Sequence, residues 1–207
     1  MRCFERMLRR AALPFHSTEG FNPRPRMVFA LSLALGIVGC EEVVELELDA
    51  ELPPEAVHER LARQAPPGLE ILSVRRIDRK TSAHVRRVCY RLALPGGRAA
   101  ELADRIASLL AVPHCWFERT RPQPRRVDLR PYLRRLRLAD DSLEIDLWVT
   151  PNGTARPEEV LDVVGLGDLL EAGSVLERTT LELADEITAG ACEPVPPAAL
   201  GISKGNS

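Results

Sequence analysis

The chain alternates short runs of strand-like and helix-like residues, and this alternation limits the folds that it can adopt. Apolar residues at every second position, as in 42–49, predict a strand with one buried face. Apolar residues at every third or fourth position, as in 98–111, predict an amphipathic helix. The predicted order is helix, strand, strand, helix, strand, followed by strand, helix, strand, strand, helix, strand. Such an order is typical of small units in which helices pack on an antiparallel sheet.

These two orders define the predicted fold class, which is α+β with two tandem ferredoxin-like (split βαβ) units. The first unit, residues 1–80, lacks the first strand of that fold, and we expect a buried strand in it at 27–35 and a further strand at 69–77. The second unit, residues 81–186, has the complete order. Residues 187–207 are rich in proline, glycine and alanine, a composition that predicts a disordered tail.

The composition indicates a globular protein of the cytoplasm. Hydrophobic residues make up 45% of the 207 residues and charged residues 28%, which is enough apolar material for a core. No apolar run approaches the roughly 18 residues of a membrane span, and charges interrupt residues 1–13, so we expect no secretory signal there. The cysteines are scattered and odd in number, as expected of free thiols in a reducing compartment. They are Cys3, Cys40, Cys89, Cys115 and Cys192.

The sequence contains no motif that specifies a metal, a nucleotide or a catalytic nucleophile. No cysteines or histidines have the spacing of a zinc or iron–sulfur site. Gly165 and Gly167 lack the third glycine of a dinucleotide-binding loop, and no serine has the flanking glycines of a hydrolase nucleophile. We therefore expect no cofactor and no metal, and we favour an accessory domain over an enzyme.

The net charge of −2 hides a strong asymmetry between the two parts of the chain. Residues 138–207 carry 14 acidic and three basic side chains, a net charge of −11, which leaves +9 for residues 1–137. Nearly all of the positive charge is arginine, whose rigid guanidinium group suits phosphate. A basic first part of this kind indicates contact with a polyanion.

The segment 119–138 is the strongest charged feature. It carries eight arginines against a single acid, Asp128; Tyr132 lies within it and Trp116 lies just before it. Guanidinium groups pair with phosphates and aromatic rings stack on bases, so this combination predicts contact with single-stranded RNA. The alternative is a solvated basic face that meets the acidic half of the chain.

Asp128 admits two interpretations. A carboxylate among many arginines stays ionised. It either orients its neighbours as a structural clamp, or it acts as a nucleophile or base in an RNA-modifying site. The sequence leaves both open, and Asp128 is the one candidate catalytic residue.

The loop 16–26 is a second candidate surface. Pro23 and Pro25 fix their own φ and restrict the residues before them, and an arginine follows each proline. Phe21 either packs inward as a plug or faces outward as a stacking group. Because a stiff loop loses little conformational entropy on binding, we include it in the predicted nucleic-acid surface.

Three segments carry a family resemblance. Residues 4–48 combine an arginine-rich helix pattern, which ends in Leu13-Pro14, with the string Glu-Gly-Phe-Asn-Pro at 19–23. The segments 127–133 and 156–166 add two shorter motifs. Together these motifs resemble the radical SAM-linked DUF2344 family over most of the chain.

The resemblance implies a partner and an RNA context. Members are encoded beside, or fused to, a radical SAM protein of the B12-binding type, often near a ribonuclease and ribosomal protein genes. Members also begin with a strand before the first helix, so the resemblance implies that this chain starts inside that element.

We therefore predict an accessory module that binds RNA or presents a substrate, and that acts with a radical SAM enzyme in RNA modification or processing. An association with the ribosome is a further expectation, and contact with a membrane is not expected. Two alternatives stay open: a protein–protein adaptor that docks on the radical SAM partner without RNA contact, and an RNA-modifying enzyme that uses Asp128. The predicted nucleic-acid-binding residues are Phe21, Arg24, Arg26, Arg125, Arg126, Arg130, Tyr132 and Arg134.

Overall fold

The computed structural model of the chain divides into two units that alternate along the sequence. Unit 1 comprises residues 1–32 and 42–83, and unit 2 comprises residues 33–41 and 84–207. The segments that the structure describes are 2–19, 21, 23–77, 82–96, 98–120 and 123–184. The predicted tail 187–207, and Gly20 and Asn22 of the loop, lie outside the described residues.

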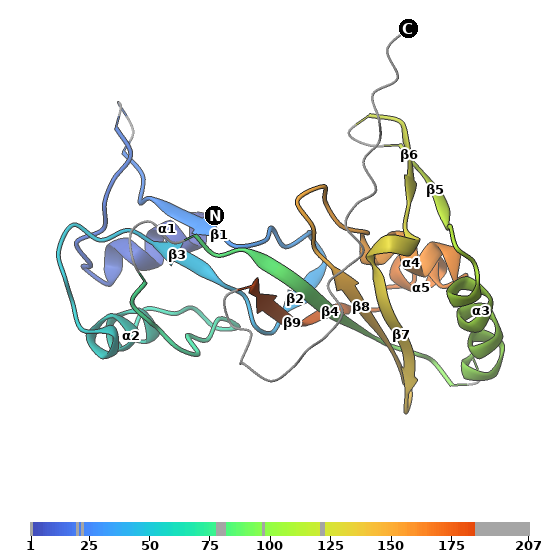
Figure 1. Cartoon of the computed structure of the whole chain (residues 1–207). Helices are drawn as coiled ribbons and strands as arrows, with labels where there is room; N and C mark the ends of the chain where they lie inside the picture. The colour runs from blue at the N-terminus through green and yellow to red at the C-terminus, as the bar shows by residue number, and fades with distance from the viewer. Residues whose placement is uncertain are drawn as a thin grey trace, which may run out of the picture. The chain divides into compact units, whose positions relative to one another are not determined.

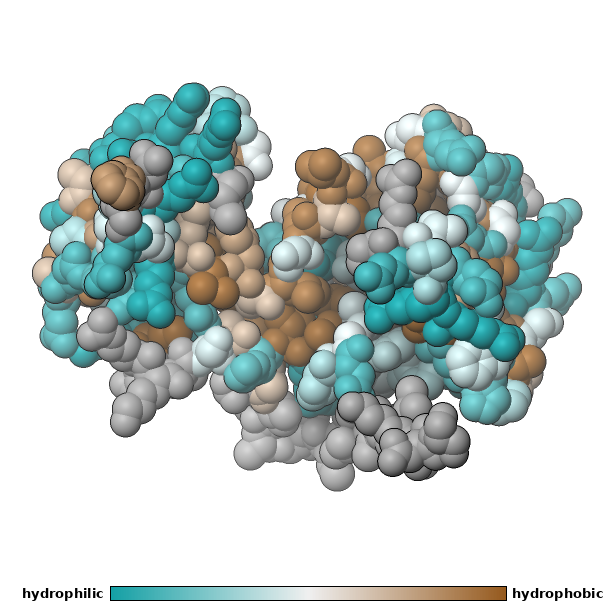
Figure 2. Space-filling model, turned by 90° about the horizontal axis from the view of Figure 1, so that it is seen from above, coloured by the Kyte–Doolittle hydropathy of each residue, from teal (hydrophilic) through white to brown (hydrophobic). Residues whose placement is uncertain are grey.

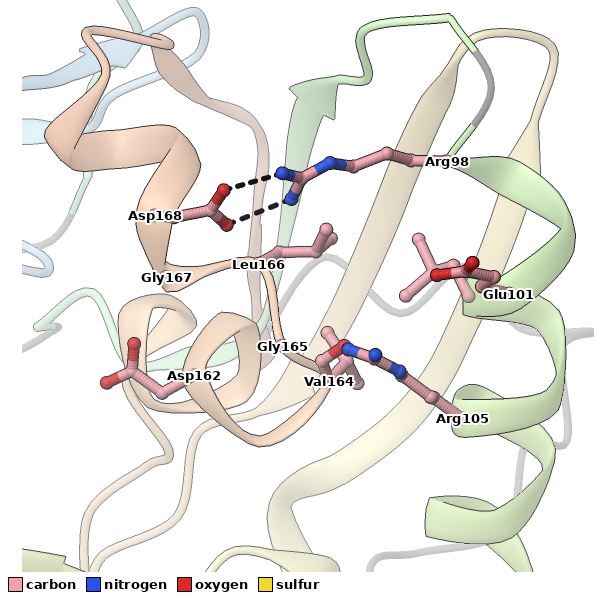
Figure 3. Close-up of a pocket in the computed structure, with 10 residues that line it drawn as sticks. Arg98, Glu101, Arg105, Asp162, Val164, Gly165, Leu166, Gly167 and Asp168 are labelled. Carbon is pink, nitrogen blue, oxygen red and sulfur yellow. Dashed lines mark hydrogen bonds and ion pairs between the residues drawn. The ribbon is translucent and has the colours of Figure 1, made fainter.

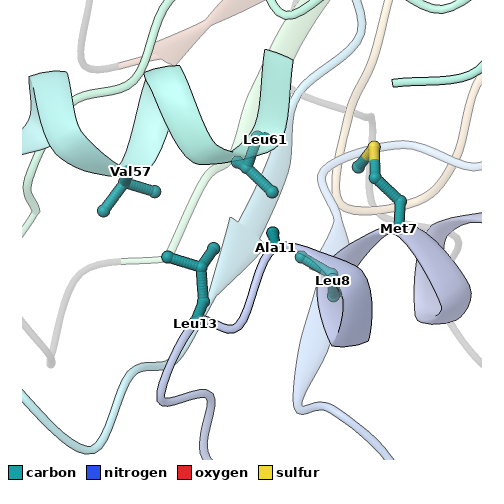
Figure 4. Close-up of a cluster of buried hydrophobic side chains, with 6 residues drawn as sticks. All are labelled: Met7, Leu8, Ala11, Leu13, Val57 and Leu61. Atoms are coloured by element: carbon teal, nitrogen blue, oxygen red, sulfur yellow. The ribbon is translucent and has the colours of Figure 1, made fainter. Parts of the chain in front are cut away.

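Unit 1 contains two helices and a small antiparallel sheet (Figure 1). The helices are α1 (Arg2–Arg10) and α2 (Pro54–Ala62), and the strands are β1 (Met27–Phe29) and β3 (Val44–Leu46). Pro54 starts α2, where a missing backbone N–H costs no helical hydrogen bond. The core forms where the apolar stripe of α1 meets that of α2, as Figure 4 shows. Its buried members are Met7, Leu8, Ala11, Leu13, Val57 and Leu61.

Two strands predicted for unit 1 differ from the structure. The strand predicted at 27–35 ends at Phe29, and Leu35 is fully exposed. Gly36, with φ of +85°, follows in the segment 33–41, which belongs to unit 2. The segment 69–77 contains no strand, although Leu69, Ile71 and Val74 pack on the core. A ring nitrogen of His58, rather than a neighbouring strand, hydrogen-bonds to the Ile71 carbonyl at 2.8 Å.

Unit 2 is built on a five-stranded sheet with the order β2-β9-β4-β8-β7. Neighbouring strands are antiparallel except β2 and β9, which are parallel. Alternate residues of β4 and β8, such as Val88, Leu92, Leu143 and Ile145, are fully buried and form one face of the sheet. The strands are β2 (Ile37–Gly39), β4 (Val85–Ala93), β7 (Leu133–Ala139), β8 (Ser142–Trp148) and β9 (Leu176–Leu183).

The helices of unit 2 are α3 (Ala99–Ala111), α4 (Pro157–Val163) and α5 (Gly167–Glu171). Figure 1 shows them grouped on one side of the sheet. Between α3 and β7 the chain inserts a two-stranded hairpin, β5 (Trp116–Arg119) and β6 (Arg125–Asp128), and a short 3₁₀ helix, η1 (Arg130–Tyr132). The predicted α+β class is confirmed. The tandem pair of ferredoxin-like units is not confirmed, because the described part of unit 1 has only a two-stranded sheet.

Apolar side chains remain on the surface among polar ones, as the face seen in Figure 2 shows. In addition to Leu35, the exposed or half-exposed apolar residues include Phe21 and Val28 in unit 1 and Val38 and Val175 in unit 2. The segment 27–35 is therefore not the buried strand that its apolar run predicts.

The cysteines differ in their expected reactivity. Cys3 and Cys40 are exposed, whereas burial, and then the neighbouring Asp146 carboxylate, raises the pKa of the Cys89 thiol to about 11. A thiol with a raised pKa stays protonated and unreactive at pH 8. We expect a thiol reagent at pH 8 to label Cys3 and Cys40 well before Cys89, as measured by peptide mass spectrometry. Equal labelling rates in the folded protein would contradict this order.

Candidate nucleic-acid interface

The β5–β6 hairpin brings aromatic and basic residues onto one face. In its register Trp116 lies opposite Asp128, and Glu118 lies opposite Arg126. Because side chains alternate between the faces of a strand, these four lie on the same face. The hairpin therefore places Arg126 diagonally across from Trp116, within reach of a long side chain.

Three of the side chains on this face form a stack. The rings of His114 and Trp116 have centroids 5.8 Å apart and planes inclined by 22°. The guanidinium carbon of Arg126 lies 4.6 Å from the centroid of the Trp116 ring, a cation–π contact. Trp116 is 51% exposed, so about half of its surface is open to solvent. We call His114, Trp116 and Arg126 the stacking platform.

Asp128 lies at the open end of the hairpin, where its carboxylate binds groups that flank β5 and β6. Its Oδ1 accepts hydrogen bonds from the backbone N–H groups of Cys115, at 2.8 Å, and Arg130, at 3.1 Å. Its Oδ2 lies 2.7 Å from His114 Nδ1. Burial acts to raise the pKa of Asp128, but the hydrogen bonds from His114 and the two backbone groups outweigh it and hold the pKa below its ordinary value. Both oxygens are thus engaged, which is the clamp interpretation of this residue.

A buried ion pair anchors the opposite face of the hairpin. Arg119 donates from Nη2 to Glu159 Oε2, at 2.8 Å, and to the Thr154 carbonyl, at 2.9 Å. The Arg119 and Glu159 side chains are 7% and 6% exposed. Glu159 also accepts the backbone N–H of Arg156 at the start of α4. The pair therefore fixes the hairpin to the helical layer of unit 2.

The predicted arginines of unit 2 fall into two groups. Arg125 and Arg126 are exposed on β6. Arg130 instead donates to the carbonyls of Leu110, Val112 and Leu133, and it thereby closes the carboxyl end of α3. Arg134 pairs with the buried Asp146 and lies over the Trp148 ring, 5.5 Å from its centroid. The guanidinium groups of Arg130 and Arg134 thus bind the unit itself, whereas Arg125 and Arg126 are exposed, Arg126 at 3.7 Å from the equally exposed Glu118 carboxylate.

Tyr132, the remaining predicted residue of unit 2, is half-buried in η1. It lies outside the stacking platform.

The described residues of the loop 16–26 in unit 1 form two paired arms, and we call this loop the finger. Arg26 N donates to the His16 carbonyl at 2.8 Å, and Thr18 N donates to the Arg24 carbonyl at 2.9 Å. Phe21, between these arms, is fully exposed, so it is not a plug. Each arginine has an acidic neighbour: Arg24 lies 3.9 Å from Glu5, and Arg26 lies 3.1 Å from Glu47. The finger and the stacking platform belong to different units.

The sheet face opposite the buried one carries balanced charge. Arg137, Glu144, Arg91 and Glu177 follow one another in a single row across β7, β8, β4 and β9. Arg137 pairs with Glu144, and Arg91 pairs with Glu177, both at 2.7 Å. A surface with alternating charges does not attract a polyanion, so this face is not a candidate for binding phosphates.

A pocket of about 560 Å³ lies between α3 and the α4–α5 turn, and Figure 3 shows its polar lining. Arg98 makes two hydrogen bonds to Asp168, at 2.9 and 2.7 Å, across its opening. Arg105 donates to the Val164 carbonyl at 3.2 Å. Both cations of the pocket are thus engaged by the protein.

The backbone conformation at position 165, which lines this pocket, favours glycine over any other residue. Its φ is +76°, and the Arg105 guanidinium occupies the position that a Cβ atom would take. We expect Gly165→Ala to lower the free energy of unfolding by about 1–3 kcal/mol, because a side chain is strained in this conformation. Chemical denaturation measures the change. The matched control is Gly96→Ala, where the new Cβ meets no described atom within 4 Å; equal losses for both variants would refute the backbone explanation.

Two functional elements were not found from the sequence. His114 was not among the predicted site residues, yet its spacing of two from Trp116 places both on one face of an extended segment. The Arg119–Glu159 pair joins residues 40 positions apart, and no local pattern indicates it.

Two further features bear on the class of site. No helix among the described residues is long and apolar enough to cross a membrane. Across the part of the chain that the structure describes, no group of three or more histidine, cysteine, aspartate or glutamate side chains could hold a metal ion.

Comparison with known proteins gives one match. A family model described as an uncharacterized protein conserved in bacteria, DUF2344, matches residues 1–161. The chain belongs to the DUF2344 family. No curated protein and no solved structure matches it. The matched part of this DUF2344 chain includes the finger, the whole stacking platform and Glu159.

Proposed function

We propose that this DUF2344 protein is a cytoplasmic accessory module that binds single-stranded RNA and acts with a radical SAM enzyme in RNA modification or processing. The observation that carries the proposal is the stacking platform, in which the half-exposed Trp116 ring contacts His114 and Arg126. Stacking on an exposed aromatic ring beside arginine is how sequence-tolerant proteins bind single strands. A double helix hides the faces of its bases, so the substrate class is an unpaired segment.

The electrostatics of unit 2 support this location. Arg126 of the platform is exposed and lies 3.7 Å from the exposed Glu118 carboxylate. Arg125 is exposed on the other face of the same hairpin, without an ion pair among the described residues, whereas the open face of the sheet is charge-balanced. The finger of unit 1 adds Phe21, Arg24 and Arg26 as a second contact. The radical SAM partner comes from the family resemblance.

The order of strands and helices in unit 2 supports a more specific fold assignment. The strands β4, β7, β8 and β9, with α3 and α4, follow the strand and helix order of a split βαβ unit, and the hairpin is an insertion in it. We propose that unit 2 is a ferredoxin-like unit that carries the RNA-binding insertion.

A protein–protein adaptor is the second candidate. The full exposure of Phe21 and Leu35 favours it, because large exposed apolar side chains are typical of docking surfaces. An enzyme that uses Asp128 as its nucleophile is not proposed, because three hydrogen bonds engage that carboxylate.

Ultraviolet crosslinking with peptide mapping tests the proposal. Purified protein is irradiated with a short uridine-rich RNA, with and without the radical SAM partner. We expect a crosslinked peptide that contains Trp116, in both conditions. Absence of any RNA crosslink would overturn the RNA-binding role, and a protein crosslink to the partner alone would favour the adaptor.

A further inference from the structure

The His114–Asp128 pair is arranged so that one ring nitrogen of His114 could accept a proton, which binding of RNA does not require. Asp128 Oδ2 lies 2.7 Å from His114 Nδ1, and backbone donors fix the other carboxylate oxygen. An ionised carboxylate accepts the proton of Nδ1–H, so the Nε2 lone pair of the neutral ring is left for a second partner. The same division of the two ring nitrogens makes histidine a general base in many enzymes.

The fold does not require this imidazole. The His114 side chain is 62% exposed, and its described contacts are with Asp128 and Trp116. The bonds from the backbone of Cys115 and Arg130 to Asp128 already hold the entry to the hairpin. An oriented, accessible histidine is therefore more than the hairpin needs for its stability.

The ring belongs to the same platform as Trp116 and Arg126. A base that stacks on the platform brings its own ribose and phosphate beside His114, Trp116 and Arg126. Arg126 is an exposed cation on the same face of the hairpin as Trp116. A base, a ribose hydroxyl and positive charge for the phosphate would then meet at one place, which is the set of groups that RNA cleavage by transesterification requires.

We propose that His114 is a general base that activates the 2′-hydroxyl of a bound ribose for attack on the adjacent phosphodiester, and that Asp128 is its positioning residue. The proposal rests on the RNA binding proposed above. Nε2 takes the hydroxyl proton, a bond forms from O2′ to phosphorus, and the bond from phosphorus to O5′ breaks. The departing O5′ takes a proton from water, and the hydroxide so formed recovers the proton from His114. The products are a 2′,3′-cyclic phosphate and a 5′-hydroxyl.

The test uses the full chain and a short, end-labelled, single-stranded RNA, and it measures binding and cleavage on the same samples. Mass spectrometry identifies the cyclic phosphate, and an RNA with 2′-O-methyl riboses must bind without being cut. We expect His114→Ala to lower the cleavage rate by about 100-fold or more, the usual contribution of a general base. The matched control is His84→Ala, which removes an exposed histidine of the same unit and should cleave like the wild type.

The outcomes separate this inference from the proposed function. RNA that binds but is not cut, or cleavage that persists in His114→Ala, overturns the catalytic role and leaves RNA binding in place. Failure to bind RNA at low salt overturns both. His114→Phe, which keeps a ring for the stack, should bind RNA without cutting it.

The positioning role of Asp128 has its own readout. Asp128→Asn should lower the cleavage rate and shift the His114 ring away from the Nδ1-protonated tautomer, as measured by ¹⁵N chemical shifts of the imidazole. A merely structural role would leave the cleavage rate of a folded variant unchanged, even where the tautomer shifts. An unchanged tautomer in folded Asp128→Asn would contradict the assignment.

Discussion

Replacement of Arg119 by methionine is expected to destabilise unit 2 by about 3–5 kcal/mol, the usual result of removing one partner of a buried ion pair. The Glu159 carboxylate would stay buried at 6% exposure with its strongest partner lost. Methionine fills much of the arginine volume, so the change isolates the charge from the packing. Both tryptophans of the chain, Trp116 and Trp148, belong to unit 2, so tryptophan fluorescence during chemical denaturation reports on this unit.

Two variants make this result specific. Arg125→Met removes the exposed arginine that lies opposite Arg119 in the hairpin, and it should change the free energy of unfolding by less than about 0.5 kcal/mol. The double variant Arg119→Met with Glu159→Leu removes both charges and should recover part of the loss. An equal effect of Arg119→Met and Arg125→Met would show that the buried pair does not anchor the hairpin.

Trp116→Ala is expected to weaken binding of single-stranded RNA by about 10- to 100-fold. One stacked base contributes about 1–3 kcal/mol, and Trp116 is the largest ring of the platform. Trp116→Phe should lose less, because it keeps a smaller stacking face. Fluorescence anisotropy with a labelled RNA measures the change.

The control for this prediction is Val175→Ala, an exposed apolar residue of unit 2 outside the hairpin. It should bind RNA like the wild type. If Trp116→Ala also binds like the wild type, the platform is not the RNA site.

The local sequence predicted elements better than it predicted contacts. The alternation of apolar and polar residues in 143–149 corresponds to β8, and the helical spacing of apolar residues in 98–111 corresponds to α3. Both were predictable because an element that buries one face repeats its apolar residues with a fixed local period. The prediction of a buried strand from the apolar run 27–35 was wrong. A run of this kind specifies hydrophobicity but not the strand that would pair with it, and Leu35 is exposed.

The candidate site shows the same limit. The cluster of arginines in 119–138 was visible in the sequence, but the partners of each guanidinium group were not. Arg119 and Arg134 contact acids that lie 40 and 12 residues away, and Arg130 contacts carbonyls of α3 and its end. Only the folded chain separates these structural arginines from the exposed Arg125 and Arg126.

The salt dependence of RNA binding tests the central claim most directly. For single strands, the logarithm of the binding constant falls with the logarithm of salt concentration by about 0.7 for each phosphate that is neutralised. We predict a steep fall between about 50 and about 200 mM salt for the wild type. The double variant Arg125→Ala with Arg126→Ala should have a shallower slope, and Arg137→Ala, whose arginine pairs with Glu144, should not. Binding that does not respond to salt, or slopes that are equal in all three proteins, would contradict an RNA interface on the β5–β6 hairpin.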